Sequence, residues 1–386
     1  MKYEGYVRVA SSTVYVQPGN AGAAFPYDTP KTGYASLAAA VDAAYDGFTL
    51  RLNAGVYESS EQISVTKALT IVGMGATPEA VVLRNTADYQ RTIELNNAGA
   101  SLANVTVENG KVKNQYGANL RIAGGACVSN CVIRGGLAVA DGGNAAGAGI
   151  AIGKSNSTIT HCVISNNVVE GTSSEGAYAG GAVFIEYEAQ NIRLSNLLIA
   201  GNRYKPSDQT KSGTAGVRYG GANNSTTMEN CTIVANEVEG SLPDASAAVY
   251  CTSWYVYFFN NIFVGNRETQ KGGGKYTSIK LDFDDRNGYK YMYNLTDDVA
   301  IGGSANKSVG NKVASATSLF KDFARGDFTL KPGCAACNAG TTTDLALMPS
   351  VDLAGNPRIF DSTGKARIDM GCYECQKKLG FAIIVR

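Results

Sequence analysis

Apolar and polar positions recur along the chain in a seven-residue phrase that occurs six times. The copies begin at Asn104, Asn130, His161, Asn196, Asn230 and Asn260, at intervals of 26, 31, 35, 34 and 30 residues. When this first residue is counted as position 0, positions −2 and +3 are apolar in every copy. Position +1 is apolar in five copies, position 0 is Asn in five and His in one, and position +6 is always Gly or Asn.

The phrase predicts two short strands joined by a bend. Positions +1 and +3 alternate like a strand with one buried face. The gap between positions −2 and +1 breaks that alternation, so the chain bends at position 0, where Asn tolerates a left-handed backbone. Coils that stack about 4.8 Å apart would bring the position-0 side chains into one column of hydrogen-bonded amides. Helical repeats have similar periods but a different apolar spacing and less Gly and Asn. The repeat therefore predicts an all-β solenoid with about 30 residues in each coil.

We expect three strands and three turns in each coil. The third strand precedes the phrase, and its candidates are 149–152, 182–186, 216–219, 248–251 and 278–283. Loops of variable length come before these strands, for example 203–216 and 267–276. Variation at one corner of a solenoid usually marks its working face.

Both ends of the stack need a cover. Residues 34–45 predict a short helix over the first coil, because Leu37, Ala40, Val41 and Ala44 share one helical face. We expect a β-helix with this N-terminal cap over residues 1–326. Residues 327–386 are expected to fold back as a C-terminal cap that closes the open end of the stack.

The composition excludes some classes of partner. The 386 residues contain 34 Lys and Arg against 33 Asp and Glu, a net charge of +1, so no overall field attracts nucleic acid or an anionic membrane. No apolar run reaches the length of about 18 residues that would span a membrane, and the first residues contain no signal peptide. We expect a monomer or a piece of a longer chain.

Motifs at both ends resemble known families. Segments 14–20, 34–44, 52–58 and 69–75 resemble the first coil of the pectin-lyase-like superfamily of right-handed parallel β-helices. The tail resembles the choice-of-anchor Q domain of bacterial surface proteins in segments 328–333, 338–340, 352–358 and 368–374, with Cys334-Ala335 where that family commonly has Ser-Pro. The resemblance implies an exported or cell-surface bacterial protein. It implies no particular reaction, because a fold does not determine function.

The third strands predict an outward-facing flank. If Ile150, Val183, Val217 and Ile279 face the core, the alternate side chains form an outer stripe. This stripe holds the candidate ligand-binding residues Phe184, Glu186, Arg218, Tyr250, Lys280 and Asp282. For a lyase, which needs a base, an acid and a group that neutralises a uronate, the candidates are Arg218, Lys280 and Glu186. The simpler interpretation of the stripe is a solvated face.

Two groups of residues could bind a metal. Asp282, Asp284 and Asp285 could hold Ca²⁺ if the protein is a lyase, although their spacing is not that of an EF-hand loop. Cys334 and Cys337 form one C-x-x-C pair, and Cys372 and Cys375 form another. These four could bind Zn²⁺, form disulfides or remain thiols, and we expect any disulfide to join one pair to the other. No other cofactor is expected.

Two functions remain open at this stage. The first is a non-catalytic β-helix module that acts as a stalk, an adhesin or a carbohydrate-binding surface for a polysaccharide or surface glycan. The alternative is a polysaccharide lyase, or another carbohydrate-active enzyme, that acts on an acidic glycan along the flank. The single histidine, His161, occupies a bend position, so we expect it to be structural.

Overall fold

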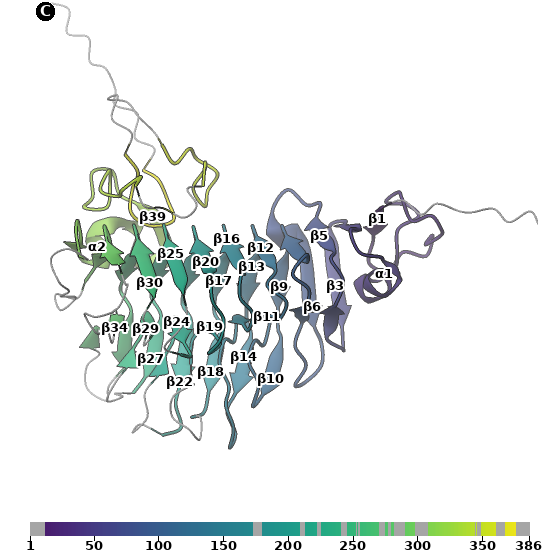
Figure 1. Cartoon of the computed structure of the whole chain (residues 1–386), viewed down its shortest axis with the longest axis horizontal. Helices are drawn as coiled ribbons and strands as arrows, with labels where there is room; N and C mark the ends of the chain where they lie inside the picture. The colour runs from purple at the N-terminus through teal and green to yellow at the C-terminus, as the bar shows by residue number, and fades with distance from the viewer. Residues whose placement is uncertain are drawn as a thin grey trace, which may run out of the picture.

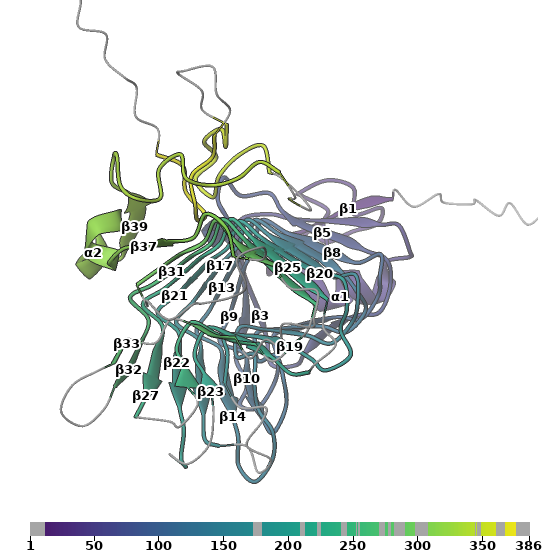
Figure 2. The same cartoon turned by 60° about the vertical axis from the view of Figure 1, so that its left-hand side comes forward.

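The computed structural model is a long stack of parallel strands (Figure 1). It describes residues 12–172, 180–208, 213–221, 225–240, 245–251, 253, 255–269, 275–276, 279–281, 290–297, 308–343, 345, 349–359 and 367–375. Three parallel sheets, here named A, B and C, enclose one apolar core, and a fourth, sheet D, extends from the wall of the tube (Figure 2). Within a repeat the chain passes through sheets C, A, B and D in that order.

Sheets A and B meet at the predicted bend. Sheet A consists of β1 (Thr13–Val16), β2 (Thr49–Leu52), β5 (Thr70–Gly73), β8 (Ser101–Ala103), β12 (Cys127–Ser129), β16 (Thr158–Thr160), β20 (Ile192–Ser195), β25 (Thr226–Glu229), β30 (Val256–Phe259) and β35 (Lys290–Met292). Sheet B consists of β3 (Gly55–Ser59), β6 (Val81–Asn85), β9 (Thr106–Glu108), β13 (Val132–Arg134), β17 (Val163–Ser165), β21 (Leu198–Ala200), β26 (Thr232–Val234), β31 (Ile262–Val264), β36 (Leu295–Thr296) and β37 (Lys312–Val313).

Sheets C and D form the other side of the repeat. Sheet C consists of β4 (Ile63–Val65), β7 (Ile93–Leu95), β11 (Leu120–Ile122), β15 (Ile150–Ile152), β19 (Val183–Ile185), β24 (Val217–Tyr219), β29 (Val249–Cys251) and β34 (Ile279–Leu281). Sheet D consists of β10 (Lys111–Lys113), β14 (Leu137–Val139), β18 (Val168–Glu170), β22 (Arg203–Lys205), β27 (Glu237–Glu239), β32 (Arg267–Thr269) and the antiparallel β33 (Lys275–Tyr276). The remaining elements are β23 (Gly213–Thr214), β28 (Ala245–Ser246), β38 (Phe320–Asp322), β39 (Asp327–Leu330), α1 (Leu37–Ala43), α2 (Ala316–Leu319) and two 3₁₀ turns, Pro78–Ala80 and Phe323–Arg325.

The expectation of three strands per coil is wrong for the coils that carry sheet D. Their fourth strand lies in the stretches that we expected to be loops. Val112, Ala138, Val169, Tyr204 and Val238 of sheet D form a second, small apolar core with the alanines that precede the sheet C strands. Sheet D is therefore a packed extension of the tube, and not a set of independent loops.

The predicted core positions are confirmed. Positions −2, +1 and +3 of all six phrases are buried, including Cys131, Cys162 and Cys231. Ile133, Ile164, Ile199 and Ile233 lie in register on adjacent strands of sheet B. The six position-0 residues all have the left-handed backbone, with φ between 48° and 58°.

The column at position 0 is less continuous than expected. Amide contacts join Asn130 to Asn104 and Asn260 to Asn230, with Nδ2 to Oδ1 distances of 2.9 Å and 3.1 Å. Between these pairs, His161 Nε2 and Asn196 Nδ2 instead contact the carbonyl oxygen of Val351, from the C-terminal part of the chain.

A continuous amide ladder runs through position +6. Asn167, Asn202, Asn236 and Asn266 are buried there, and each amide donates to the next at 2.9–3.0 Å. The first two copies have Gly110 and Gly136 at this position, and Asn119 takes part in their place, donating to Asn167 at 3.0 Å. A Cβ atom at Gly110 would lie 1.9 Å from the carbonyl oxygen of Ala118, so this position requires glycine.

The N-terminal cap is confirmed. Helix α1 begins after Ser36, whose hydroxyl accepts a hydrogen bond from the amide of Ala39 at 3.2 Å. The four expected side chains, from Leu37 to Ala44, are buried against the first coils. Within the described residues, no helix is long and apolar enough to cross a membrane.

The described residues of the C-terminal segment do not pack as the expected end cap. Its described residues 331–343, 349–359 and 367–375, here called the C-terminal arm, lie along the side of the stack. Met370 and Cys372 pack on the outer face of sheet B against Val234 and Ile262. Asn260 Nδ2 donates to the carbonyl oxygen of Thr341, also in the arm, at 2.9 Å. The arm therefore covers the corner between sheets A and B over several coils (Figure 1).

Candidate functional site

The expected outer stripe on sheet C is largely covered. Phe184, Arg218 and Tyr250 point away from the tube as predicted, but their exposed fractions are 1%, 4% and 8%. The segments that lead into sheet C run over this face, and Tyr116 packs on Phe184 with the ring centroids 4.7 Å apart. These three residues therefore do not form an accessible ligand-binding stripe.

Arg218 has a packing partner. Its guanidinium carbon lies 3.8 Å from the centroid of the Tyr250 ring, so the cation rests on an aromatic face. Burial lowers the pKa of Arg218, because the charged form loses its hydration. This arrangement fits a structural cation better than a group that neutralises a bound uronate.

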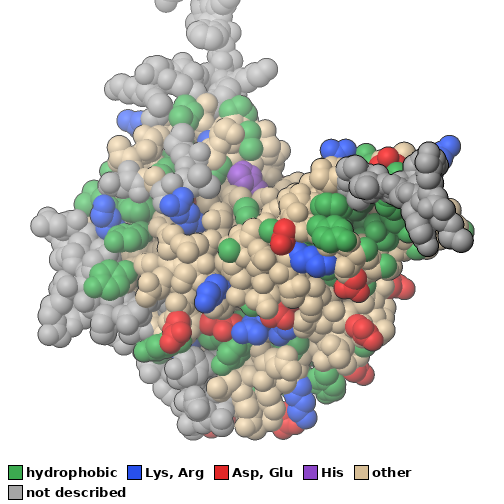
Figure 3. Space-filling view, turned by 45° about the vertical axis from the view of Figure 1, so that its right-hand side comes forward, with side chains coloured by type: hydrophobic (Ala, Val, Ile, Leu, Met, Phe, Trp, Pro, Cys, Tyr) green, Lys and Arg blue, Asp and Glu red, His purple; other side chains and the backbone are tan. Residues whose placement is uncertain are grey.

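Glu186 is at the end of a ladder of alternating charges. Arg121 Nε lies 3.2 Å from Glu186 Oε1, and Arg121 Nη1 lies 3.6 Å from Glu94 Oε1. Arg91 Nη1 lies 3.4 Å from Glu94 Oε2, three residues away on the same coil. Figure 3 shows acidic and basic side chains interspersed on this flank. Because Glu186 has the cation of Arg121 beside it, its carboxylate is not positioned as the free general base that a lyase needs.

The other flank candidates lie outside the described residues. These are Asp282, Asp284, Asp285 and the side chain of Lys280. Their roles as calcium ligands or binding residues stay predictions.

The four C-terminal cysteines are described, and they do not form a zinc site. Within the described residues, no group of three or more His, Cys, Asp or Glu side chains could hold a metal ion. The sulfur contact in this region joins Cys334 to Cys337, at 3.5 Å, and not one pair to the other. Cys372 is fully buried, and its amide donates to the hydroxyl of Thr232. All four cysteines are free thiols in this structure, so the expectation that a disulfide would join one pair to the other stays a prediction.

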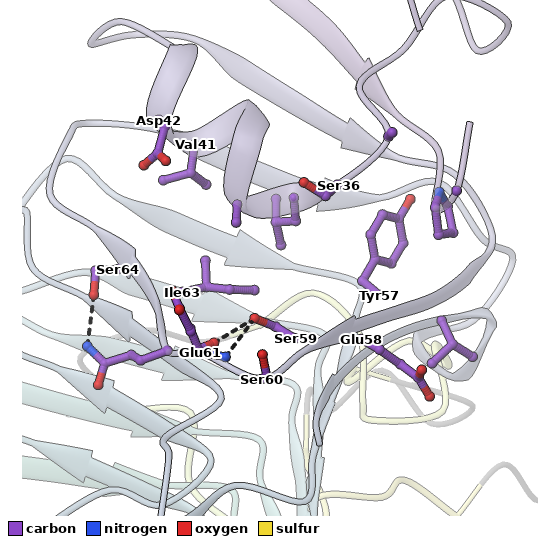
Figure 4. A pocket seen from close by; sticks show the side chains of 17 residues that line it. Ser36, Val41, Asp42, Tyr57, Glu58, Ser59, Ser60, Glu61, Ile63 and Ser64 are labelled. Carbon is purple, nitrogen blue, oxygen red and sulfur yellow. Dashed lines mark hydrogen bonds between the residues drawn. The ribbon is translucent and has the colours of Figure 1, made fainter. Parts of the chain in front are cut away.

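An open cleft of about 630 Å³ lies at the N-terminal end of the stack. One wall is α1 with the residues that precede it, including Ser36 and Asp42. The opposite wall is β3 and the turn into β4, which bring Glu58, Ser59 and Glu61 to the cleft (Figure 4). The cleft lies where α1, which packs on the first coils, stands beside this turn, and Leu37, Val41 and Asp42 of the helix are among the residues that line it.

Local hydrogen bonds hold the turn wall in place. The Ser59 hydroxyl donates to the carbonyl oxygen of Glu61 at 2.7 Å and accepts from the Glu61 amide at 3.2 Å. The Tyr57 hydroxyl donates to the carbonyl oxygen of Val16 at 2.7 Å, which ties β3 to the first strand. Gln62 Nε2 lies 2.7 Å from Glu94 Oε2, so the cleft adjoins the charge ladder on sheet C.

The lining of the cleft is acidic and rich in hydroxyl groups. It contains Asp42, Glu58 and Glu61 together with Ser36, Ser59, Ser60 and Ser64, and no Lys or Arg. Asp42 and Glu61 are exposed, and Glu58 has a salt bridge to Arg84 at 3.4 Å. Carboxylates accept hydrogen bonds from two neighbouring hydroxyl groups, and serines both donate and accept. The chemistry therefore suits a ligand with many hydroxyl groups.

The amino-acid pattern alone does not predict this cleft. Segment 52–58 resembles the first coil of the pectin-lyase-like superfamily, and residues 34–45 predict a helix, but neither pattern indicates that the two face each other. The close spacing of Glu58 and Glu61 with three serines is the signal that could have drawn attention to the turn.

A second cluster of charges lies under the C-terminal arm. Arg358 is fully buried and donates to Glu374 Oε1 at 2.8 Å and to the carbonyl oxygen of Gly371 at 2.8 Å. Its Nη2 donates to the side-chain oxygen of Asn196, at the bend position. Asp369 lies beside this pair, and its two carboxylate oxygens accept hydrogen bonds from the backbone amides of Asn338 and Cys375, both at 2.6 Å. This cluster attaches the arm to the stack, and its burial leaves no room for a substrate.

The cluster predicts a pH-dependent stability. Burial and the charge of Asp369 raise the pKa of Glu374 to about 8, against the opposing effect of Arg358, and burial raises the pKa of Asp369 as well. The folded state then holds protons that the unfolded state releases, so this contribution is complete below pH of about 4.5 and is lost as the pH rises through about 8. We expect the free energy of unfolding to fall by about 1–2 kcal/mol between pH 6.5 and 8.5, measured by urea denaturation.

The control for this prediction is Glu374→Gln, which should flatten the dependence. His161 contributes the opposite slope, because burial lowers its pKa, but only below its ordinary value of 6.5. A free energy of unfolding that rises over the window from pH 6.5 to 8.5 would contradict the assignment.

Comparisons with known proteins agree with the strand topology. A family model described as the right handed beta helix region matches residues 91–282. The structure is similar to pectate lyase Pel9A, with 15% identity, a TM-score of 0.44, and coverage of 94% of this chain and 96% of that chain. It is also similar to a pectin methylesterase from Aspergillus niger, with 14% identity, a TM-score of 0.39, and coverage of 84% and 91%.

A pectin methylesterase from carrot is a more distant neighbour, with 14% identity, a TM-score of 0.31, and coverage of 79% of this chain and 89% of that chain. No curated protein sequence matches the chain. At these levels of identity and TM-score, the similar structures carry no statement about activity. The matched region and the stacked parallel sheets make this chain a right-handed parallel β-helix, the fold that its resemblance to the pectin-lyase-like superfamily implied.

Proposed function

We propose that the protein is a non-catalytic, carbohydrate-binding β-helix module that binds a polysaccharide or surface glycan in the N-terminal cleft. The observation that carries this proposal is the lining of the cleft, which has three carboxylates, four serine hydroxyls and no Lys or Arg. Such a surface offers hydrogen bonds to sugar hydroxyls, while its negative charge repels a polyuronate. The ligand class that fits is therefore a neutral or amino-substituted glycan.

The alternative of a polysaccharide lyase has less support. Under the lyase hypothesis, the reacting groups are Arg218, Lys280 and Glu186 along the flank of sheet C. Arg218 is buried against Tyr250, and Glu186 is paired with Arg121. A lyase would need these groups to reach the substrate.

The wider setting is also a proposal. The tail resemblance to the choice-of-anchor Q domain favours an exported or cell-surface bacterial protein, acting as a stalk or adhesin within a longer chain or as a monomer. The motif residues of the tail contact each other in the arm, since Arg358 binds Glu374, and the amide of Glu374 donates to Asp352. Binding in the cleft, as proposed, requires no cofactor, nucleic acid or membrane.

The test is a glycan array with the full chain, followed by titration of the best neutral or amino-sugar ligand. Glu61→Lys should weaken binding by about tenfold or more, which corresponds to the loss of about 1.4 kcal/mol. The matched control is Glu79→Lys, an exposed glutamate that does not line the cleft, and its affinity should stay within about twofold.

The same preparation should be incubated with acidic polysaccharides while the ultraviolet absorbance of unsaturated products is followed. A rise in absorbance, with no neutral glycan bound, would overturn the proposal in favour of the lyase. Equal loss of binding in Glu61→Lys and Glu79→Lys would show that the ligand binds elsewhere.

A further inference from the structure

The turn that follows β39 brings two thiols together. Cys334 Sγ and Cys337 Sγ lie 3.5 Å apart, and both side chains are partly exposed. The amide of Cys334 donates to the carbonyl oxygen of Lys331 at 3.2 Å, and the amide of Cys337 donates to that of Cys334 at 3.1 Å. Both cysteines therefore lie in one hydrogen-bonded turn, and the backbone of this turn brings the two sulfur atoms close together.

The turn is anchored on both sides. Ala336, between the two thiols, is fully buried, and its carbonyl oxygen accepts from the amide of Met370 at 3.0 Å. The amide of Asn338 donates to Asp369 Oδ1 at 2.6 Å, and Lys312 Nζ donates to the carbonyl oxygen of Ala335 at 2.9 Å. These contacts hold the backbone between the cysteines at a fixed curvature, with the sulfurs on the accessible side.

We propose that Cys334 and Cys337 form a redox-active dithiol, which a small-molecule disulfide or a thiol–disulfide oxidoreductase converts to an intramolecular disulfide. The geometry points to this pair because the sulfurs already touch, so closure requires only a small rotation of the side chains. The proposal concerns a covalent modification site in the arm and is independent of glycan binding in the N-terminal cleft.

The reaction is an exchange of two disulfides. The thiolate of Cys334 attacks one sulfur of the oxidant, forms a mixed disulfide and releases the first reduced thiol. Cys337 then loses its proton to solvent and attacks the Cys334 sulfur, which releases the second reduced thiol. The two cysteines lose two electrons and two protons, and the oxidising disulfide gains both.

Cys334 is the attacking thiol. A hydrogen bond from Cys337, together with the backbone amides of Ala336 and Cys337, lowers the pKa of Cys334 to about 7. The pKa of Cys337 is raised, because its thiol donates to Cys334 and is partly buried. At neutral pH, Cys334 should react with iodoacetamide about tenfold faster than Cys337.

The test uses trypsin, which separates the two pairs of cysteines. Trypsin does not cut the Lys331–Pro332 bond, so peptide 326–358 carries Cys334 and Cys337, and peptide 368–377 carries Cys372 and Cys375. The reduced full chain is equilibrated with oxidised and reduced glutathione, quenched in acid, unfolded in guanidine with excess N-ethylmaleimide at near-neutral pH, and digested. We expect peptide 326–358 to be two hydrogen atoms lighter and unlabelled, while peptide 368–377 carries two maleimides.

Variants test the order of the steps. Cys337→Ser should trap glutathione on Cys334, whereas Cys334→Ser should leave Cys337 with at least about tenfold less adduct. The matched control is Cys375→Ser, in which peptide 326–358 should oxidise as in the unmodified protein. Peptides 326–358 and 368–377 joined to each other, or peptide 326–358 fully labelled in oxidising glutathione, would overturn the proposal. Glutathione trapped mainly on Cys337 would overturn the assignment of the attacking thiol.

Discussion

Above a pH of about 8, where Glu374 is ionised, replacing Arg358 by Met should lower the free energy of unfolding by about 3–5 kcal/mol, the usual effect of breaking a buried ion pair. The guanidinium is fully buried and donates to Glu374, Gly371 and the side chain of Asn196. Its loss removes these three hydrogen bonds and leaves the carboxyl groups of Glu374 and Asp369 close together without their cation, with only the amide of Asp369, among the described residues, still donating to Glu374. Chemical denaturation should show the loss, and amide hydrogen exchange should increase most in residues 349–359 and 367–375.

The matched control is Arg325→Met. Arg325 also pairs with an acid, Asp322, at 3.7 Å, but its side chain is 87% exposed. Exposed pairs of this kind contribute about 0–1 kcal/mol. If the two variants lose similar stability, the arm does not depend on its buried cation.

Asn202→Ala is expected to cost about 3 kcal/mol, because one buried side chain makes four hydrogen bonds. Its Oδ1 accepts from the backbone amide and from Nδ2 of Asn167, both at 3.0 Å. Its Nδ2 donates to Asn236 Oδ1 at 2.9 Å and to the carbonyl oxygen of Ile164 at 3.0 Å. Alanine would leave the amide of Asn167 buried and without an acceptor, on the path between two adjacent coils.

Asn130→Ala provides the comparison, since Asn130 is exposed and joins only the less continuous column at position 0. We expect a cost of about 1 kcal/mol there, mainly because alanine is less tolerant of the left-handed backbone. Thermal unfolding of both variants would measure the difference. Equal costs would mean that burial of the position +6 ladder adds nothing to stability.

The sequence predicted the elements that depend on short-range periodicity. Ile133 and Ile164 each occupy position +3 of the phrase, two residues after the buried position +1, so their burial follows from the pattern alone. The left-handed bend at Asn196 and the helix from Leu37 follow in the same way from local backbone preference and capping. Such features can be predicted without knowing which other segments pack against them.

The errors come from contacts between segments far apart in the chain. Phe184 occupies an outward position on its strand, but its cover, Tyr116, comes from an earlier coil. The attachment of Arg358 to Asn196 joins residues 162 positions apart, and no periodic pattern encodes it. Glu61 and Asp42 lie on opposite walls of the cleft, and this arrangement likewise depends on how α1 docks on the first coils.

The lateral course of the C-terminal arm has a mechanical consequence. In a solenoid each coil touches only its neighbours, so a pull on the last coil would peel the stack one coil at a time. The arm contacts His161 through Val351, Asn196 through Arg358 and Asn260 through Thr341. Tension applied at the C-terminal end would therefore load several coils in shear at once. We expect these coils to unfold together at a higher force, and not one after another from the end of the stack.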